Sequence, residues 1–212
     1  MPQPCRNTSK RRRIDVSDLI AAFYERNSAK FDSSRRKSFS ERAWLDRFLQ
    51  PLPKGGRVLD LGCGAGEPVS RHLIDRGFMV SGVDISPKMV GLCRTRFPRH
   101  RWINADMRRV AMDGFYDGVL AWDSLFHLHG DEQAAVIVRI GAWLAPGGRV
   151  LFNTTPVKGT EMESFQGEPL YRPSLEPHQY REAFVRAELA EIDYRPEDPA
   201  CGGRSIWYLR KA

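Results

Sequence analysis

The chain has 212 residues, of which 42% are hydrophobic and 28% are charged, so it contains enough apolar sequence for one full core. It has no run of about eighteen apolar residues for a membrane span and no apolar N-terminal segment of the kind that a signal peptide needs. We therefore expect a single domain over residues 15–212, in a cytoplasmic protein without a membrane partner.

The net charge of +7 is concentrated at one end of the chain. Residues 1–14 contain five arginine and lysine residues and no acidic residue. Such a tail could bind nucleic acid through phosphate contacts, but a solvated, disordered terminus is the commoner origin of this composition. We expect residues 1–14 to be disordered and do not expect a nucleic-acid partner. The four cysteines are scattered, which predicts free thiols and no metal site.

The predicted elements begin with residues 15–50, whose apolar side chains recur at the spacing of one or two amphipathic helices. From residue 57 onward, short apolar runs alternate with longer amphipathic ones. The predicted strands are residues 57–62, 78–84, 101–106, 116–122 and 149–155, and the predicted helices between them are residues 67–77, 86–97 and 131–144. This order indicates an α/β, Rossmann-like, mostly parallel sheet with helices on both faces.

The last quarter of the chain departs from this alternation. Residues 156–178 are rich in Gly, Pro and Glu and are predicted to form a long loop. A helix is predicted over residues 178–190. Two apolar runs, residues 189–196 and 204–211, are expected to pair as an antiparallel hairpin at the edge of the sheet.

The stretch VLDLGCGAGEP, residues 58–68, joins the first strand to the first helix of the sheet. Gly62, Gly64 and Gly66 allow the backbone to pass close to a ligand, because glycine has no Cβ. A dinucleotide fingerprint needs a glycine at the next position, where this chain has Glu67. A carboxylate there would repel a diphosphate at the helix N-terminus. The turn therefore predicts an adenosine-like cofactor without phosphate and disfavours an NAD-dependent dehydrogenase.

Acidic residues follow at the ends of the next strands. Asp84 ends the second strand, where a carboxylate accepts hydrogen bonds from both ribose hydroxyls. Asp106 ends the third strand and could accept from an adenine amino group, with the thioether of Met107 against the ring. Asp60, just before the glycine turn, could meet a positively charged amino group. Acceptors for ribose, adenine and ammonium at successive strand ends fit S-adenosylmethionine better than other common cofactors.

The segment AWDSLFHLHG, residues 121–130, follows the fourth strand, where a transferred methyl group would emerge. Trp122 and Phe126 could form walls of an acceptor pocket. Asp123 could orient the acceptor or take its proton, and His127 or His129 could act as a base near neutral pH. The alternative is structural: a single His or Asp at such a place often serves only the packing.

The motifs VLDLGCGAG, VSGVDIS, INADMR, YDGVLAWDSLFHL and LAPGGRVLF occur in this order over residues 57–153. Together they resemble the class I S-adenosylmethionine-dependent methyltransferases, and the opening FYERNSAKFD resembles the lid helix of their small-molecule members. The resemblance implies a seven-stranded sheet of order 3-2-1-4-5-7-6 with the last strand antiparallel. It also implies lid helices over residues 15–50 and a substrate cap over residues 156–178, with Glu168, Tyr171 and His178 as polar candidates.

In that family the residues matching Asp60, Gly62, Gly64 and Gly66 line the methionine end of the cofactor. Asp84 then binds the ribose, Asp106 binds the adenine, and an aromatic residue at Tyr24 or Phe31 covers the cofactor. The residues predicted to bind the cofactor are Tyr24, Asp60, Gly62, Cys63, Gly64, Gly66, Asp84, Ile85, Asp106, Met107 and Trp122, and those predicted to be catalytic are Asp123 and His127.

The predicted function is methyl transfer from S-adenosylmethionine to a small-molecule acceptor by in-line displacement. Two alternatives remain: a methyltransferase acting on RNA or protein, and a non-catalytic domain that binds S-adenosylmethionine. No NPPY or DPPY sequence follows the fourth strand, where AWDS stands instead. The exocyclic amino group of a nucleobase is therefore not favoured as the methyl acceptor. The acceptor atom and the oligomeric state are not predicted.

Overall fold

The computed structural model describes residues 16–36, 39–155, 159–165 and 167–212. Seven strands form one sheet in the order β3-β2-β1-β4-β5-β9-β8, which confirms the predicted order once the two C-terminal strands are counted as the sixth and seventh. Strand β9 runs antiparallel to both of its neighbours, and β1 to β5 are parallel. The strands are β1 (Arg57–Leu61), β2 (Met79–Asp84), β3 (Arg101–Asn104), β4 (Tyr116–Ala121), β5 (Leu144–Thr154), β8 (Leu189–Asp198) and β9 (Arg204–Lys211).

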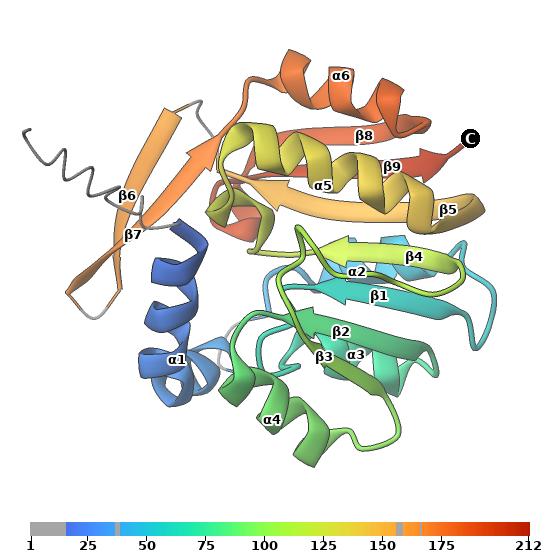
Figure 1. Cartoon of the computed structure of the whole chain (residues 1–212). Helices are drawn as coiled ribbons and strands as arrows, with labels where there is room; N and C mark the ends of the chain where they lie inside the picture. The colour runs from blue at the N-terminus through green and yellow to red at the C-terminus, as the bar shows by residue number, and fades with distance from the viewer. Residues whose placement is uncertain (1–15, 37–38, 156–158, 166) are drawn as a thin grey trace, which may run out of the picture.

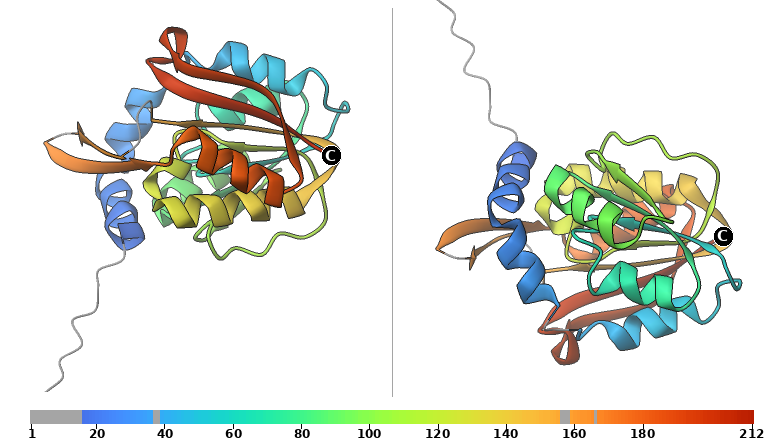
Figure 2. Two further views of the ribbon diagram at one scale, coloured as in Figure 1. Left: turned by 90° about the horizontal axis from the view of Figure 1, so that it is seen from above. Right: turned by 90° about the horizontal axis from the view of Figure 1, so that it is seen from below.

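Helices cover both faces of this sheet (Figure 2). One apolar layer joins one sheet face to α5 and α6, and another joins the opposite face to α2, α3 and α4. The helices are α1 (Val16–Arg35), α2 (Arg42–Leu49), α3 (Val69–Asp75), α4 (Pro87–Arg96), α5 (Gly130–Trp143) and α6 (Pro177–Arg186), with short 3-10 turns η1 (Leu125–His127) and η2 (Pro199–Cys201). Ser86 caps α4, and its side chain accepts a hydrogen bond from the Met89 amide.

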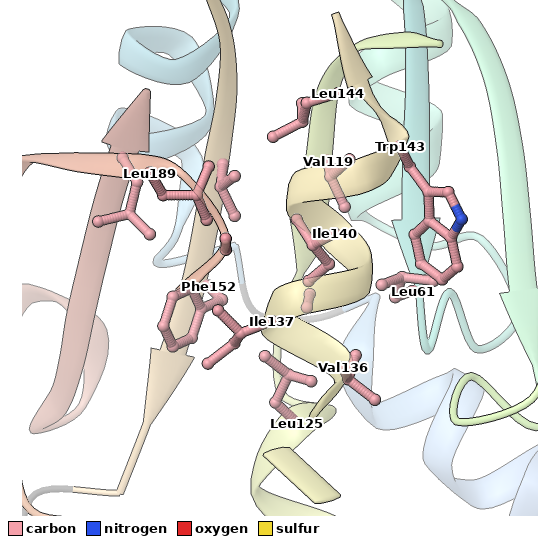
Figure 3. Close-up of a cluster of buried hydrophobic side chains, with 14 of the residues drawn as sticks. Leu61, Val119, Leu125, Val136, Ile137, Ile140, Trp143, Leu144, Phe152 and Leu189 are labelled. Atoms are coloured by element: carbon pink, nitrogen blue, oxygen red, sulfur yellow. The ribbon is translucent and has the colours of Figure 1, made fainter. Parts of the chain in front are cut away.

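The helix α5 shows how the apolar spacing builds the core. Val136, Ile137 and Ile140 are buried on one side of the helix, in the same cluster as Leu61 of β1 and Val119 of β4 (Figure 3). Burial of a side chain of this kind stabilises the fold by roughly 1.5–3 kcal/mol. The packing fixes α5 against the sheet, and with it the preceding turn η1 at the carboxyl end of β4.

The helix α2 lies on the sheet face, so the segment 15–50 does not act as one lid. Leu45 and Phe48 are fully buried in the layer that covers β1, β4 and β5. Gly118 of β4 makes room for this helix, because an added Cβ would lie 2.5 Å from the Phe48 ring. Of the two N-terminal helices, it is α1 that lies beside the carboxyl ends of β1, β2 and β4 (Figure 1).

The prediction of a long loop over residues 156–178 is wrong. The strands β6 (Gly159–Phe165) and β7 (Glu168–Ser174) form a separate antiparallel hairpin that projects from the body of the molecule near α1 (Figure 1). Gly167 has a φ of 81° at the turn, and β7 contains two prolines, Pro169 and Pro173. Proline is tolerated here because each strand of a two-stranded sheet is an edge strand. The composition that suggested a loop is therefore compatible with an isolated hairpin.

Two further expectations meet the structure only in part. The predicted helix over 178–190 is shorter, since α6 ends at Arg186 and β8 begins at Leu189. The predicted disordered tail, residues 1–14, lies outside the described residues. In the described part of the chain, no helix combines the length and the apolar character needed to cross a bilayer.

Candidate active site

A single pocket gathers almost all of the predicted site residues at the carboxyl ends of β1, β2 and β4. It encloses about 1040 Å³ of space not occupied by atoms, a figure that includes its open mouth. The predicted residues that line it are Tyr24, Asp60, Gly62, Cys63, Gly64, Asp84, Ile85, Asp106, Met107, Trp122, Asp123 and His127. The exception is Gly66.

The glycine turn serves two different purposes. Gly62 and Gly64 line the pocket with φ values of 75° and 52°, which favour glycine. Gly66 has a φ of 78°, but a Cβ there would lie 2.7 Å from the ring of Phe97. Gly66 is not among the residues that line the pocket, and its missing side chain accommodates the packing of Phe97 behind the turn. Its predicted role in binding the cofactor stays a prediction.

Asp84 holds the glycine turn and α4 in place from the end of β2. One carboxylate oxygen accepts from the Gly64 amide at 2.8 Å, and the other accepts from the Ser86 amide at 2.9 Å. Burial raises the pKa of Asp84, and these two backbone hydrogen bonds oppose the rise. Each carboxylate oxygen has a further lone pair, so both remain able to accept from ligand hydroxyls.

Asp60 is the most deeply buried acid of the pocket, with 2% of its surface exposed. Its carboxylate accepts from the Ser70 hydroxyl at 2.5 Å. Burial raises the pKa of Asp60 to about 6 and the charge of Asp84 adds to this, while the Ser70 hydrogen bond and the Arg35 charge oppose it. A positively charged ligand at this carboxylate would favour its ionised form.

Asp106 lies at the pocket wall with an arginine already bound. Arg108 donates to its carboxylate from Nε at 2.9 Å and from Nη2 at 2.6 Å. Burial alone would raise the pKa of Asp106, but hydrogen bonds and charge from Arg108 outweigh it and lower the pKa. An adenine amino group would therefore share this carboxylate with Arg108, a neighbour that the sequence analysis did not consider.

Asp123 follows β4 with a φ of 50° and is fixed by residues far away in the chain. Arg204 of β9 donates from Nε and Nη2 to its two carboxylate oxygens, at 2.6 Å and 2.9 Å, and Asn153 of β5 donates at 2.8 Å. Burial would raise the pKa of Asp123, but Arg204 outweighs it and the pKa falls. A carboxylate with a lowered pKa and both oxygens bound is a poor proton acceptor, so the geometry opposes the predicted role of Asp123 as a base.

His127 lines the pocket from η1 and is 7% exposed. Its Nε2 lies 2.9 Å from the hydroxyl of Tyr24, on α1. The two rings meet edge to face, and Tyr24 makes a similar contact with Phe31, which also lines the pocket. The structure thus joins a predicted lid residue to a predicted base.

The other predicted bases and cap residues are elsewhere. His129 is the N-cap of α5 and forms a capping box with Glu132. It is not among the residues that line the pocket. His178 is exposed on α6. The side chains of Glu168 and Tyr171 lie outside the described part of the structure, and their predicted role stays a prediction.

Sequence reasoning missed the contacts that hold α1 over the pocket. Glu25 accepts from the Ser86 hydroxyl at 2.8 Å and from the Lys88 amide at 3.3 Å, at the N-terminus of α4. Burial opposes ionisation of Glu25, but these hydrogen bonds and the Lys88 charge lower its pKa. A carboxylate at a helix N-terminus is also favoured by the helix dipole.

The far end of α1 is held by a second ion pair. Arg96, at the end of α4, donates from two nitrogens to Asp32 at 2.6 Å and 2.7 Å, and Arg36 donates to the same carboxylate at 2.6 Å. The Arg96 hydrogen bond keeps the pKa of Asp32 low despite burial. An aspartate and an arginine 64 residues apart leave no local signal in the sequence.

Residues 31–192 match the sequence profile of the methyltransferase domain family. The chain belongs to this family. It is 36% identical over 116 residues to a putative methyltransferase, YqeM, of Bacillus subtilis (strain 168), a match that covers 52% of this chain and 47% of that protein. It is 37% identical over 114 residues to the 27-O-demethylrifamycin SV methyltransferase of Amycolatopsis mediterranei (strain S699), covering 49% and 42% of the two chains.

The chain spans about half the length of the curated relatives it matches. Among solved structures it is similar to CalS10 with bound S-adenosylmethionine, an amino pentose methyltransferase from Micromonospora echinaspora. The TM-score is 0.69 at 19% identity, with 87% of this chain and 96% of that chain covered. At this identity the likeness establishes the class I methyltransferase fold.

Proposed function

We propose that this methyltransferase-family protein binds S-adenosylmethionine and transfers its methyl group to a small-molecule acceptor in the cytoplasm. The observation that carries the proposal is a difference in ion pairing: Asp60 and Asp84 differ from the other acidic residues of the pocket. Within the described residues, neither Asp60 nor Asp84 forms an ion pair, whereas the four other pocket acids are each paired with an arginine. A ligand that brings a positive charge to Asp60 and hydroxyls to Asp84 complements both.

A phosphate-bearing nucleotide fits this pocket poorly. Asp60, Glu67 and Asp84 all line it near the glycine turn, and a diphosphate there would face three carboxylates. S-adenosylmethionine carries a sulfonium and an ammonium group instead, with an adenosine part that matches the strand-end acceptors.

Methyl transfer from a sulfonium is an in-line displacement: the acceptor atom forms a bond to the methyl carbon as the carbon–sulfur bond breaks, and the electron pair stays on sulfur. Much of the catalysis comes from holding the acceptor about 3 Å from the methyl carbon and excluding water, which α1 does by covering the pocket. An acceptor that must lose a proton needs a base, and His127, with Tyr24 at its Nε2, is the histidine in the pocket lining.

The alternatives are less well supported. Arginines that could contact RNA near the pocket are engaged in ion pairs, as Arg36 and Arg96 are with Asp32. A non-catalytic binding domain would not need a buried histidine–tyrosine pair beside the cofactor region.

Calorimetry with S-adenosylhomocysteine and a methyl-transfer assay with radiolabelled S-adenosylmethionine test the proposal. The assay uses a mixture of phenols, carboxylic acids and primary amines in one arm and total RNA in the other. We expect binding, with label entering small molecules. Label entering RNA alone would support the macromolecular alternative, binding without transfer to any acceptor would support the non-catalytic one, and an absence of binding would refute the proposal.

A further inference from the structure

Two buried cysteines lie together at the glycine turn. Cys63 belongs to the turn and lines the pocket, and Cys93 is on α4. Both thiols contact the same backbone oxygen, since Cys93 donates to the Gly64 carbonyl at 3.2 Å and Cys63 lies 3.7 Å from it. The third cysteine in the described part of the chain, Cys201, donates to a different carbonyl, that of Ser40, at 3.5 Å.

Neighbouring glycines leave the space that the two sulfur atoms fill. A Cβ on Gly82 of β2 would lie 2.8 Å from Sγ of Cys63, and a Cβ on Gly66 would lie 3.3 Å from Sγ of Cys93. Cys93 is fully buried, and 8% of Cys63 is exposed. In an interior packed this closely, the two sulfur atoms have little freedom to move apart.

The two thiols also contact each other. A hydrogen bond to Cys93 is the largest cause that raises the pKa of Cys63, and burial and the charges of Asp84 and Asp60 act in the same direction. Cys63 is therefore a neutral thiol near neutral pH, with a second thiol within hydrogen-bond reach. Such a pair needs only an oxidant to form a disulfide, because the fold has already brought the two sulfur atoms together.

We propose that Cys63 and Cys93 form a reversible disulfide in the presence of a hydroperoxide, and that this bond weakens cofactor binding. Hydrogen peroxide is small enough to reach Cys63 through the pocket that this residue lines. Formation of the disulfide does not depend on the proposed function, whereas its effect on the cofactor rests on that function.

The reaction with hydrogen peroxide takes two steps. The thiolate of Cys63 attacks one peroxide oxygen, the O–O bond breaks, and a sulfenic acid on Cys63 and one water molecule are formed. The thiolate of Cys93 then attacks the sulfenic sulfur, the S–S bond forms, and the hydroxyl group leaves as a second water molecule. The two sulfur atoms lose two electrons to the peroxide oxygens, and both thiol protons end in water.

The disulfide would change the support of the glycine turn. A disulfide has no S–H group, so the Gly64 carbonyl loses both thiol contacts. The amide of the same residue donates at 2.8 Å to Asp84, the carboxylate proposed to accept from the ligand hydroxyls. A displacement of Gly64 would therefore carry Asp84 with it, and the cofactor would lose affinity.

The test uses the full chain with Cys5→Ser, which removes the cysteine that lies outside the described residues. After hydrogen peroxide treatment, non-reducing peptide mapping should show Cys63 linked to Cys93, and dithiothreitol should reverse the link. The rate should rise between about pH 7 and pH 8.5, because only the thiolate reacts. Calorimetry should show at least about tenfold weaker binding of S-adenosylhomocysteine after oxidation, restored by reduction.

Cys93→Ser is the main variant, because a serine hydroxyl can keep the hydrogen bond to Gly64 while one sulfur is removed. It should bind S-adenosylhomocysteine as the reduced parent does and should keep that affinity after peroxide treatment. Cys93→Ala is measured as well, in case the hydroxyl disturbs this buried position. The matched control is Cys201→Ser at another buried cysteine, which should form the disulfide and lose affinity as the parent does.

Peroxide treatment that leaves Cys63 and Cys93 as thiols, or converts them to unlinked sulfinic acids, would overturn the inference. An equal loss of affinity in the treated Cys93 variants would assign the effect to another oxidised group. A disulfide that forms without a change in affinity would refute its control of the cofactor. If the reduced protein did not bind S-adenosylhomocysteine, the proposed function would fail, and peptide mapping would still decide whether the disulfide forms.

Discussion

The hydroxyl of Tyr24 lies 2.9 Å from Nε2 of His127, although 103 residues separate the two in the chain. Tyr24 is on α1, which lies over the pocket, and His127 is on the turn that follows β4. The contact therefore depends on the docking of α1, which brings Tyr24 to the histidine that we propose as the base.

We expect His127→Gln to lower kcat for an acceptor that must lose a proton by roughly 10²–10⁴-fold, because general-base catalysis is lost. Binding of S-adenosylhomocysteine should stay within about twofold, which calorimetry checks. Tyr24→Phe keeps the ring and removes the hydroxyl, and it should shift the pH dependence of kcat/KM. Wild-type kcat in both variants would assign the pair a packing role.

The raised pKa of Asp60 predicts how cofactor affinity depends on pH. A cationic ligand favours the ionised carboxylate, so below the pKa of about 6 binding must first remove a proton. Affinity for S-adenosylhomocysteine should therefore fall by up to about tenfold per unit as pH drops below that value, and should level off above it.

Calorimetry between about pH 5 and pH 7.5 measures this dependence. Asp60→Asn should bind more weakly at neutral pH and should lose the dependence. The same slope in Asp60→Asn as in the wild type would assign the titration to another group, such as Asp84.

Asp32 connects α1 to α4 through Arg96, and its removal tests the docking of the helix. We expect Asp32→Asn to reduce the hydrogen-exchange protection of α1 by about 1–3 kcal/mol, because a mostly buried ion pair is broken, and to speed dissociation of S-adenosylhomocysteine. The control is Asp113→Asn at an exposed ion pair, which should change neither quantity. Equal protection in all three proteins would show that α1 does not depend on this ion pair.

The glycines of the turn serve two purposes, so Gly64→Ala and Gly66→Ala should destabilise the fold to different extents. Gly64→Ala meets only backbone strain, since no atom lies within 4 Å of the added Cβ. Gly66→Ala meets the same strain and a contact of 2.7 Å with Phe97. We expect it to lower the free energy of unfolding by about 1–3 kcal/mol more than Gly64→Ala, measured in urea. A larger loss for Gly64→Ala would contradict this description of the turn.

The sheet was predictable because each of its parallel strands is a short apolar run and each is followed by an amphipathic helix or a turn. Asp60 and Asp84 were also predictable as pocket residues, since parallel strands place their carboxyl ends at one edge. The hairpin of β6 and β7 was missed because prolines in β7 suggest a loop until it is known that both strands are edges.

The pairing of side chains across the pocket was beyond the reach of the sequence. Asp123 was identified as a site residue, but its partner Arg204 lies 81 positions away on the antiparallel strand. Arg35 carried no signal either, because one arginine among several near the end of an amphipathic helix has no distinguishing pattern. Such pairs depend on tertiary contacts that neither spacing nor composition encodes.

The attachment of α1 to both ends of α4 has a consequence for the timing of the reaction cycle. With the cofactor bound as proposed, a spent cofactor would lie beneath a helix held by Glu25 at one end of α4 and by Asp32 at the other. We expect these attachments to slow exchange with fresh donor. They are largely ionic, so added salt would shorten the residence time of the spent cofactor and, where its departure limits turnover, would make the enzyme faster.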